Sequence, residues 1–96
     1  MSIESINNLT PKISNTAFVH DSAVIIGDVE VGSESSIWPN TTLRGDMGKI
    51  KIGDQTSIQD NTCCHMTNGL SSLIVGNRVT VGHSVILHGC IVEDDC

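Results

Sequence analysis

The sequence predicts an all-β protein, a parallel β-helix, on three observations. Aliphatic residues recur every six positions, β-branched residues are abundant, and no segment has the spacing of an amphipathic helix. Twelve Ile, nine Val and eight Thr make up 29 of the 96 residues, and this composition favours strands. A period of six is a multiple of the two-residue repeat of a strand, and it does not fit the 3.6-residue turn of a helix.

The repeat begins after Pro11 and is interrupted twice. Its aliphatic positions are Ile13, Val19, Ile25, Val31, Ile37 and Leu43, then Ile52, Ile58 and Cys64, then Val75, Val81 and Leu87. Four positions after the first six come mostly small or β-branched residues, namely Ala17, Ala23, Val29, Ser35, Thr41 and Met47. Three repeats, about 18 residues, would complete one triangular coil and return the chain to the same face about 4.8 Å higher. An ordinary β-sandwich is the alternative, and regular sixes without hairpin signals disfavour it.

The elements follow in order along one domain, residues 1–96. Residues 1–12 are expected to form an N-terminal cap or an extended segment, and residues 13–96 to form the coils. Loops are expected at 47–51 and 66–72, where the repeat is interrupted and glycines occur. Corner glycines are expected at Gly27, Gly32, Gly53, Gly76, Gly82 and Gly89. The last coil is incomplete, and solenoids normally carry a polar cap, so we expect a chain truncated before its last coils.

Charge and hydropathy exclude several classes of partner. A net charge of −6 and five scattered basic residues argue against a nucleic-acid surface. No apolar run approaches the roughly 18 residues of a membrane span, and the N-terminus lacks the features of an export signal. We therefore expect a soluble, cytoplasmic protein with no nucleic-acid or membrane partner. In such a compartment the four cysteines are expected to be free thiols.

Three histidines have the spacing of a metal site. His65 and His83 are separated by three repeat lengths, one full coil, so we expect them near the same edge on successive turns, with His88 around the next corner. Three His ligands with water in the fourth position are typical of open zinc sites. Three side chains do not easily converge from the convex surface of one prism, so we expect the metal at an interface in a cyclic oligomer. The alternative for each histidine is a solvated surface imidazole, and His20, which has no partners, keeps that interpretation.

Three segments resemble the gamma-class carbonic anhydrase family and its bacterial homologues. They are Ile37-Trp-Pro-Asn-Thr-Thr-Leu-Arg-Gly-Asp46, Ile58-Gln-Asp-Asn61 ahead of His65, and Val79-Thr-Val-Gly-His-Ser-Val-Ile-Leu-His-Gly-Cys90. The resemblance extends from about Phe18 to the end of the chain. It implies left-handed hexapeptide coils, although the general rule for crossovers favours the right hand. It also implies a homotrimer with a metal at each subunit interface, and a C-terminal helix and further coils beyond this sequence.

The same resemblance implies the ligands and the reaction. The metal ligands would be His65 and His88 of one chain and His83 of the next, with Zn2+ as the usual metal and Fe2+ or Co2+ as alternatives. The activity would be reversible hydration of CO2 to bicarbonate, because zinc lowers the pKa of a bound water from 15.7 to about 7. Family members with high activity carry acidic residues in loops near the site. Here Met47 follows Asp46, and residues 66–72 contain no Asp or Glu.

Four polar residues are candidates for a catalytic role on this resemblance. Arg44 resembles the family arginine that pairs across the interface with an aspartate, here Asp60, with Asp46 nearby. Gln59 resembles the glutamine that orients metal-bound solvent. The alternatives are a structural ion network that fixes the trimer register for the three charged residues, and a hydrogen bond between stacked rungs for Gln59. A non-catalytic metal-stabilised trimeric scaffold and a hexapeptide acyltransferase stay open as other functions, because a fold does not fix a function.

Overall fold

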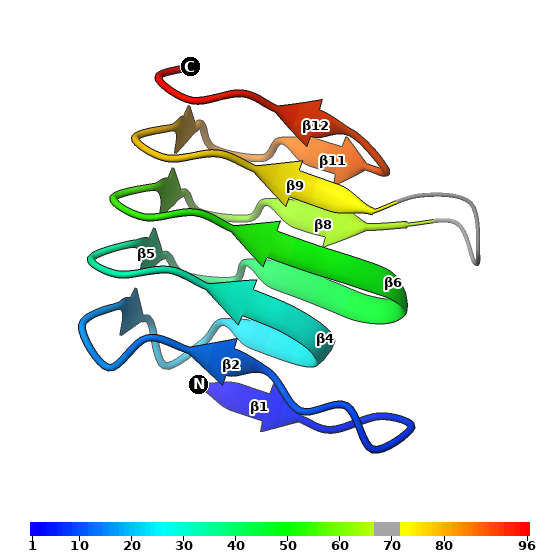
Figure 1. Cartoon of the computed structure of the whole chain (residues 1–96). Coiled ribbons are helices and arrows are strands. Elements are labelled where there is room, and N and C mark those ends of the chain that lie inside the picture. The colour runs from blue at the N-terminus through cyan, green and yellow to red at the C-terminus, as the bar shows by residue number, and fades with distance from the viewer. Residues whose placement is uncertain (67–71) are drawn as a thin grey trace.

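Short strands follow one another around a three-sided prism in the computed structural model, which describes residues 1–66 and 72–96 (Figure 1). These two ranges contain twelve strands and no helix. In chain order the strands are β1 (Ser2–Glu4), β2 (Lys12–Ile13), β3 (Phe18–Val19), β4 (Val24–Val31), β5 (Ser36–Ile37), β6 (Thr42–Ile52), β7 (Ser57–Ile58), β8 (Cys63–His65), β9 (Leu73–Val75), β10 (Thr80–Val81), β11 (Ile86–His88) and β12 (Ile91–Val92).

The strands pair in parallel between successive coils, as the repeat predicts. One face of the prism is the four-stranded sheet β3-β5-β7-β10, and an eight-stranded sheet covers the other two faces. Strands β4 and β6 turn a corner, so that the first part of β6 pairs with β8 and its last part with β9. The coils rise from β1 at the bottom of Figure 1 to β12 at the top in a left-handed parallel β-helix. The predicted fold class is confirmed.

Three successive coils, followed on the face of β3, β5, β7 and β10, increase in length. Phe18 pairs with Ser36, Ser36 with Ser57, and Ser57 with Thr80, so each of these coils contains more residues than the one before it. The first increase falls inside β6, where the register shifts. Segment 45–50 of β6 lies opposite 27–29 of β4, which leaves three extra residues in β6.

This register corrects one expectation about residues 47–51. We expected a loop there, whereas β6 continues as a strand through the whole segment. Met47, four positions after Leu43, is 43% exposed. Ile50 takes the inward place, pairs with Val29 and is completely buried. The corner absorbs the extra residues and leaves the pairing on either side intact. The second expected loop, residues 66–72, falls mostly on residues 67–71, which lie outside the described part of the chain.

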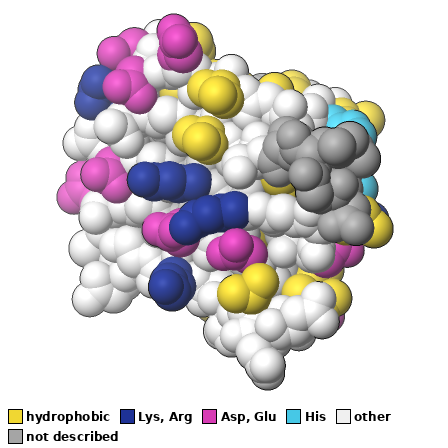
Figure 2. Space-filling model, turned by 45° about the vertical axis from the view of Figure 1, so that its right-hand side comes forward, with side chains coloured by type: hydrophobic (Ala, Val, Ile, Leu, Met, Phe, Trp, Pro, Cys, Tyr) yellow, Lys and Arg dark blue, Asp and Glu magenta, His cyan; other side chains and the backbone are white. Residues whose placement is uncertain are grey.

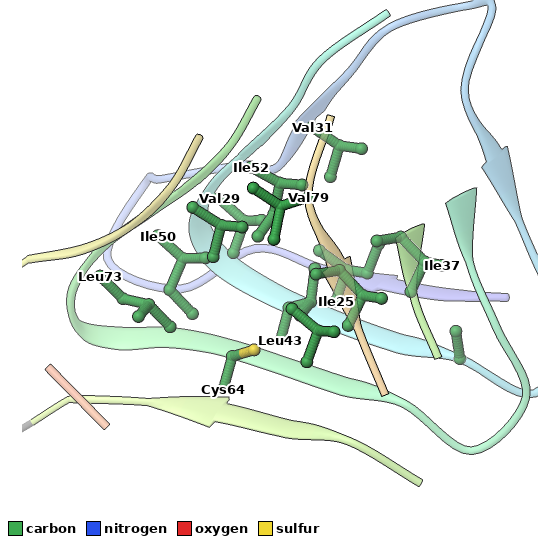
Figure 3. Close-up of a cluster of buried hydrophobic side chains, with 14 of the residues drawn as sticks. Ile25, Val29, Val31, Ile37, Leu43, Ile50, Ile52, Cys64, Leu73 and Val79 are labelled. Carbon is green, nitrogen blue, oxygen red and sulfur yellow. The ribbon is translucent and has the colours of Figure 1, made fainter. Parts of the chain in front are cut away.

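The core is a column of aliphatic side chains along the prism axis (Figure 3). The repeat positions that are buried are Ile25, Val31, Ile37, Leu43, Ile52, Ile58, Cys64, Val75 and Val81. Ile13, Val19 and Leu87 are partly buried and pack against this column. Burial of apolar area at about 25 cal/mol per Å² is the main source of stability for such a stack. The repeat therefore predicts the core well.

The cysteines are in the expected state in the described part of the chain. The four cysteines are free thiols, and adjacent Cys63 and Cys64 differ in burial, as alternating strand residues do. Within the same ranges there is no helix long and apolar enough to cross a membrane.

Candidate functional site

Polar residues of three successive coils lie on the outer face of β6, β8 and β11. Leu43, Cys64 and Leu87 point inward at equivalent positions, and the residue after each points outward. Those outward residues are Arg44, His65 and His88. The pairing of the strands therefore places one arginine and two histidines in a vertical row about one strand spacing apart, roughly 4.8 Å.

His65 and His88 form a parallel stack. The two residues are register partners across β8 and β11, their ring centroids are 5.4 Å apart, and the ring planes differ by 13°. The side chain of His65 is 27% exposed. Two imidazoles of one chain therefore face the same region of space, in the pairing that the resemblance implied.

The expected alignment of His65 with His83 is wrong. It assumed a coil of three uninterrupted repeats, but the coil between β8 and β11 is longer, and its register makes His88 the partner of His65. His83 instead lies at the corner between β10 and β11, above Asp60 on the coil below. The amide of Ser84 donates to the carbonyl oxygen of Asp60 at 2.9 Å, and Nδ1 of His83 lies 3.4 Å from Oδ1 of Asp60.

Arg44 connects His65 to Asp46. Its Nη2 lies 2.9 Å from Nε2 of His65, and its Nε donates to Oδ2 of Asp46 at 3.1 Å. The other carboxylate oxygen of Asp46, Oδ1, is buried, lies 3.8 Å from Nε2 of His65, and has no hydrogen-bond partner within the described residues. Within one chain Arg44 thus pairs with Asp46, and Asp60 faces His83. The pairing of Arg44 with Asp60 that we expected across an interface stays a prediction.

Gln59 follows β7 and directly precedes Asp60, on the outer side of the β5-β7-β10 sheet. Its side-chain amide donates to Oγ of Ser57 at 3.2 Å, within its own strand segment. Trp38, one coil below, donates from Nε1 to Oγ of Ser36 at 2.9 Å and of Ser57 at 3.1 Å. Ser57 therefore links the two side chains, and Gln59 is half-buried.

His20 takes no part in this arrangement. Its Nδ1 pairs with Oγ of Ser22 at 2.9 Å, and its ring touches Phe18 edge-on at a centroid distance of 6.4 Å. It lies on an early coil, away from His65 and His88. The interpretation of His20 as an ordinary surface histidine agrees with these contacts.

One chain does not gather a complete metal site in its described ranges. No group of three His, Cys, Asp or Glu side chains there is placed to hold a metal ion. The arrangement brings two imidazoles together and leaves the third on another corner with its own carboxylate. Figure 2 shows histidine side chains at the right-hand edge of a face that carries acidic and basic side chains. Lys12, Glu30 and Lys51 are register partners across β2, β4 and β6.

The hydrogen bond between Arg44 and His65 is the contact that sequence reasoning missed. It joins equivalent positions of successive coils, and the coil between them includes the three extra residues of β6. The nine-residue step in the repeat was the available signal. It would have placed Arg44 directly below His65.

Comparison with known proteins indicates the same family that the site residues resemble. The profile of the family described as bacterial transferase hexapeptide (six repeats) matches residues 10–45. Gamma carbonic anhydrase 2, mitochondrial, of Arabidopsis thaliana is 46% identical over 91 residues, which cover 90% of this chain and 33% of that protein. A carbonic anhydrase of Geobacillus kaustophilus is 48% identical over 84 residues, covering 88% of this chain and 46% of that protein.

The chain is a hexapeptide-repeat relative of the gamma carbonic anhydrases. A crystal structure of a hexapeptide transferase family protein from Anaplasma phagocytophilum superimposes with a TM-score of 0.89 at 43% identity. That superposition covers 94% of this chain and 52% of the other. The chain thus spans about half, or less, of the length of the relatives that it matches.

Proposed function

We propose that this chain belongs to a metal-dependent enzyme that reversibly hydrates CO2 to bicarbonate. The ligands would be His65 and His88 of one chain and His83 of a second copy in a homotrimer. The parallel stack of His65 on His88 is the observation that carries the proposal, because it holds two imidazoles of one chain side by side on the outer face, with ring centroids 5.4 Å apart. The relatives named carbonic anhydrase support the same reaction.

The residues present fit a divalent cation. Imidazole nitrogens suit Zn2+, Fe2+ and Co2+, so the ligand set admits all three metals. A guanidinium can only donate, so Nε2 of His65 accepts from Arg44 and carries a lone pair, as a ligand nitrogen must. Oδ1 of Asp46, buried and without a described hydrogen-bond partner, adds negative charge 3.8 Å from that nitrogen. When bound, the ion would supply the Lewis acidity that brings the pKa of water near neutrality.

The chain's own side chains would orient the ligands and the reacting groups. Asp60, 3.4 Å from Nδ1 of His83, would hold that imidazole with Nε2 directed away from its own prism. Arg44 and Asp46 would fix the ring of His65 in the same manner. Gln59, which directly precedes Asp60 in the sequence, would bind the reacting water or an oxygen of CO2. The released proton would also need an acceptor. Met47 is exposed but has no carboxylate, so transfer of this proton would depend on the external buffer.

Stopped-flow CO2 hydration by the purified, metal-loaded protein tests the proposal. We expect activity in the parent chain, loss of at least about a hundredfold in His83→Ala, since a metal ligand is removed, and no change in the matched variant His20→Ala. Metal analysis of each preparation identifies the bound ion. A metal-loaded oligomer with no rate above that of buffer would overturn the proposal.

Two other functions make different predictions in the same preparation. A hexapeptide acyltransferase is supported by the description of the Anaplasma phagocytophilum structure, and it would transfer an acyl group from coenzyme A without added metal. A non-catalytic scaffold would bind metal, and its oligomer would dissociate when the metal is chelated. It would show neither CO2 hydration nor acyl transfer. The cytoplasmic location is also a proposal, and cell fractionation tests it.

A further inference from the structure

The nitrogen of His65 that faces the candidate site already has a partner in the chain itself. Nη2 of Arg44 lies 2.9 Å from Nε2 of His65, and the guanidinium has donors only. The imidazole must therefore accept, so its ring proton is on Nδ1 and its lone pair is on Nε2. The guanidinium is held in this position from its other side, because its Nε donates to Oδ2 of Asp46 at 3.1 Å.

A single lone pair can accept one hydrogen bond or bind one cation. A metal ion that uses Nε2 of His65 must therefore displace the guanidinium of Arg44. Two features make this displacement feasible. The Arg44 side chain is 42% exposed and is not locked in the core. Asp46 also has a second carboxylate oxygen, Oδ1, buried and without a hydrogen-bond partner in the described residues, which can accept the released donor.

We infer that Arg44 reversibly occupies the ligand nitrogen of His65 and moves fully onto Asp46 when a metal binds. The inference rests on the proposed function, since it takes His65 as a ligand. In the metal-free protein Arg44 fixes the tautomer that leaves Nε2 unprotonated, and it competes with the incoming cation for that atom. Arg44 is in this sense a positioning residue that sets metal affinity, and Asp46 is its second docking point.

The tautomer of His65 tests the contact without any metal. We expect the ring nitrogens of His65, observed by 15N NMR in the metal-free protein, to show the Nδ1-protonated form. In Arg44→Met the Nε2-protonated form should become populated, and in the matched variant Arg78→Met, which removes an exposed arginine that pairs with Asp95, nothing should change. An Nε2-protonated His65 in the parent protein would overturn the inference.

Co2+ affinity tests the competition. We expect Arg44→Met to bind Co2+ about tenfold more tightly than the parent, because this variant lacks the charge-assisted hydrogen bond that competes with the ion for His65. The gain should persist at 1 M ionic strength, where the Debye length is about 3 Å and a long-range charge effect vanishes. Arg78→Met should bind as the parent does. Equal affinity of Arg44→Met and the parent, or a gain that disappears in salt, contradicts the inference.

The variant His65→Ala separates this inference from the proposed function. If His65→Ala loses Co2+ binding and Arg44→Met has no effect, the proposed ligand stands and only the role of Arg44 fails. If His65→Ala binds Co2+ as the parent does, or the parent binds none, the proposed metal site fails and the competition fails with it. Loss of binding in His65→Ala together with the gain in Arg44→Met supports both.

Discussion

Cys64 is a titratable group in the centre of the core. It is completely buried, and burial raises the pKa of its thiol from the ordinary value of 9.0 to about 12, with smaller contributions from Cys63 and Cys90. The unfolded thiol ionises at the lower pKa. The stability that the buried thiol contributes is therefore fully present below about pH 9 and is lost as the pH rises toward 12.

We predict that the free energy of unfolding falls with pH in this window by up to about 1.4 kcal/mol per pH unit because of Cys64. Urea unfolding at a series of alkaline pH values measures it. Cys64→Val should remove this part of the pH dependence, whereas Cys96→Ser, at an exposed thiol, should keep it. The same slope in Cys64→Val and in the parent would show that another group titrates.

At the scale of single residues, the sequence selected candidate ligands but misjudged how two of them align. His65, His83 and His88 could be selected from their spacing, and the resemblance implied that His65 and His88 belong to one chain. Counting three repeats per coil placed His65 beside His83, because the count ignored residues inserted at the corners. The same omission concealed the contact of Arg44 with His65. The proposed ligand roles would depend on a second copy, whose position no spacing within one chain determines.

At the scale of elements, the corners decide how closely two coils can approach. Three glycines stack at one corner, Gly32, Gly53 and Gly76, and a Cβ atom on Gly53 would lie 2.5 Å from the carbonyl oxygen of Gly76. The side chains that follow make a ladder there. Asp54 accepts from the amide of Ser33 at 2.8 Å, and Asn77 accepts from the amide of Asp54 at the same distance.

We predict that Gly53→Ala destabilises the protein by about 1–3 kcal/mol, because the new methyl group contacts the backbone of the next coil and forces it to move. The matched control is Gly82→Ala, where a Cβ atom would meet nothing within 4 Å. Its effect should stay within about 0.5 kcal/mol. Thermal unfolding of both variants is the measurement. Equal destabilisation by the two substitutions would mean that backbone entropy, and not the close approach, decides the effect.

Buried hydroxyl groups also connect the coils. Oγ1 of Thr56 donates to the carbonyl oxygen of Gly76 at 2.7 Å and accepts from the amide of Val79 at 3.3 Å. Thr41 and Thr62 donate in the same way to the coil above. These residues sit where the repeat has small or β-branched members. Their hydroxyls satisfy backbone groups that the short strands leave unpaired.

We predict that Thr56→Val costs about 1–3 kcal/mol of stability, because valine keeps the shape and leaves a buried carbonyl and amide without this partner. Thr80→Val, on the exposed side of β10, is the matched control and should be close to neutral. Denaturant unfolding of the two variants gives the comparison. A neutral Thr56→Val would indicate that water replaces the hydroxyl.

The repeat predicted the elements, and the insertions limited that prediction. Aliphatic residues at six-residue spacing specify which side chains face inward, and Ile25, Ile37 and Leu43 are completely buried. The repeat does not predict where a strand continues through an insertion. Segment 47–51 breaks the repeat, yet it remains a strand because the extra residues bulge at a corner and Ile50 restores the pairing. A gap in a repeat therefore marks an insertion without specifying its conformation.

At the scale of the whole molecule, one prism presents its histidines in two directions. His65 and His88 stack on the face of β8 and β11, while His83 stands at the corner beside Asp60 with a side chain that is 68% exposed. A rigid prism cannot bring this corner over its own face. A cyclic arrangement of copies can place the corner of one prism against the face of the next, so the proposed site needs two chains.

Mixed oligomers of two defective variants test that shared site. His65→Ala and His83→Ala should each bind no Co2+, because every interface then lacks one ligand. After the two are unfolded together and refolded as a one-to-one mixture, an interface is complete where the intact His83 of one chain meets the intact His65 of its neighbour. Random assembly of a cyclic oligomer makes about one quarter of the interfaces complete.

We therefore expect about a quarter of the parental Co2+ binding, read from the visible absorption of the ion, together with the same share of CO2 hydration. A mixture of His65→Ala with His88→Ala is the matched control and should recover nothing, because both of these ligands come from one chain. Recovery in the control, or none in the first mixture, would contradict a site shared between copies in this way.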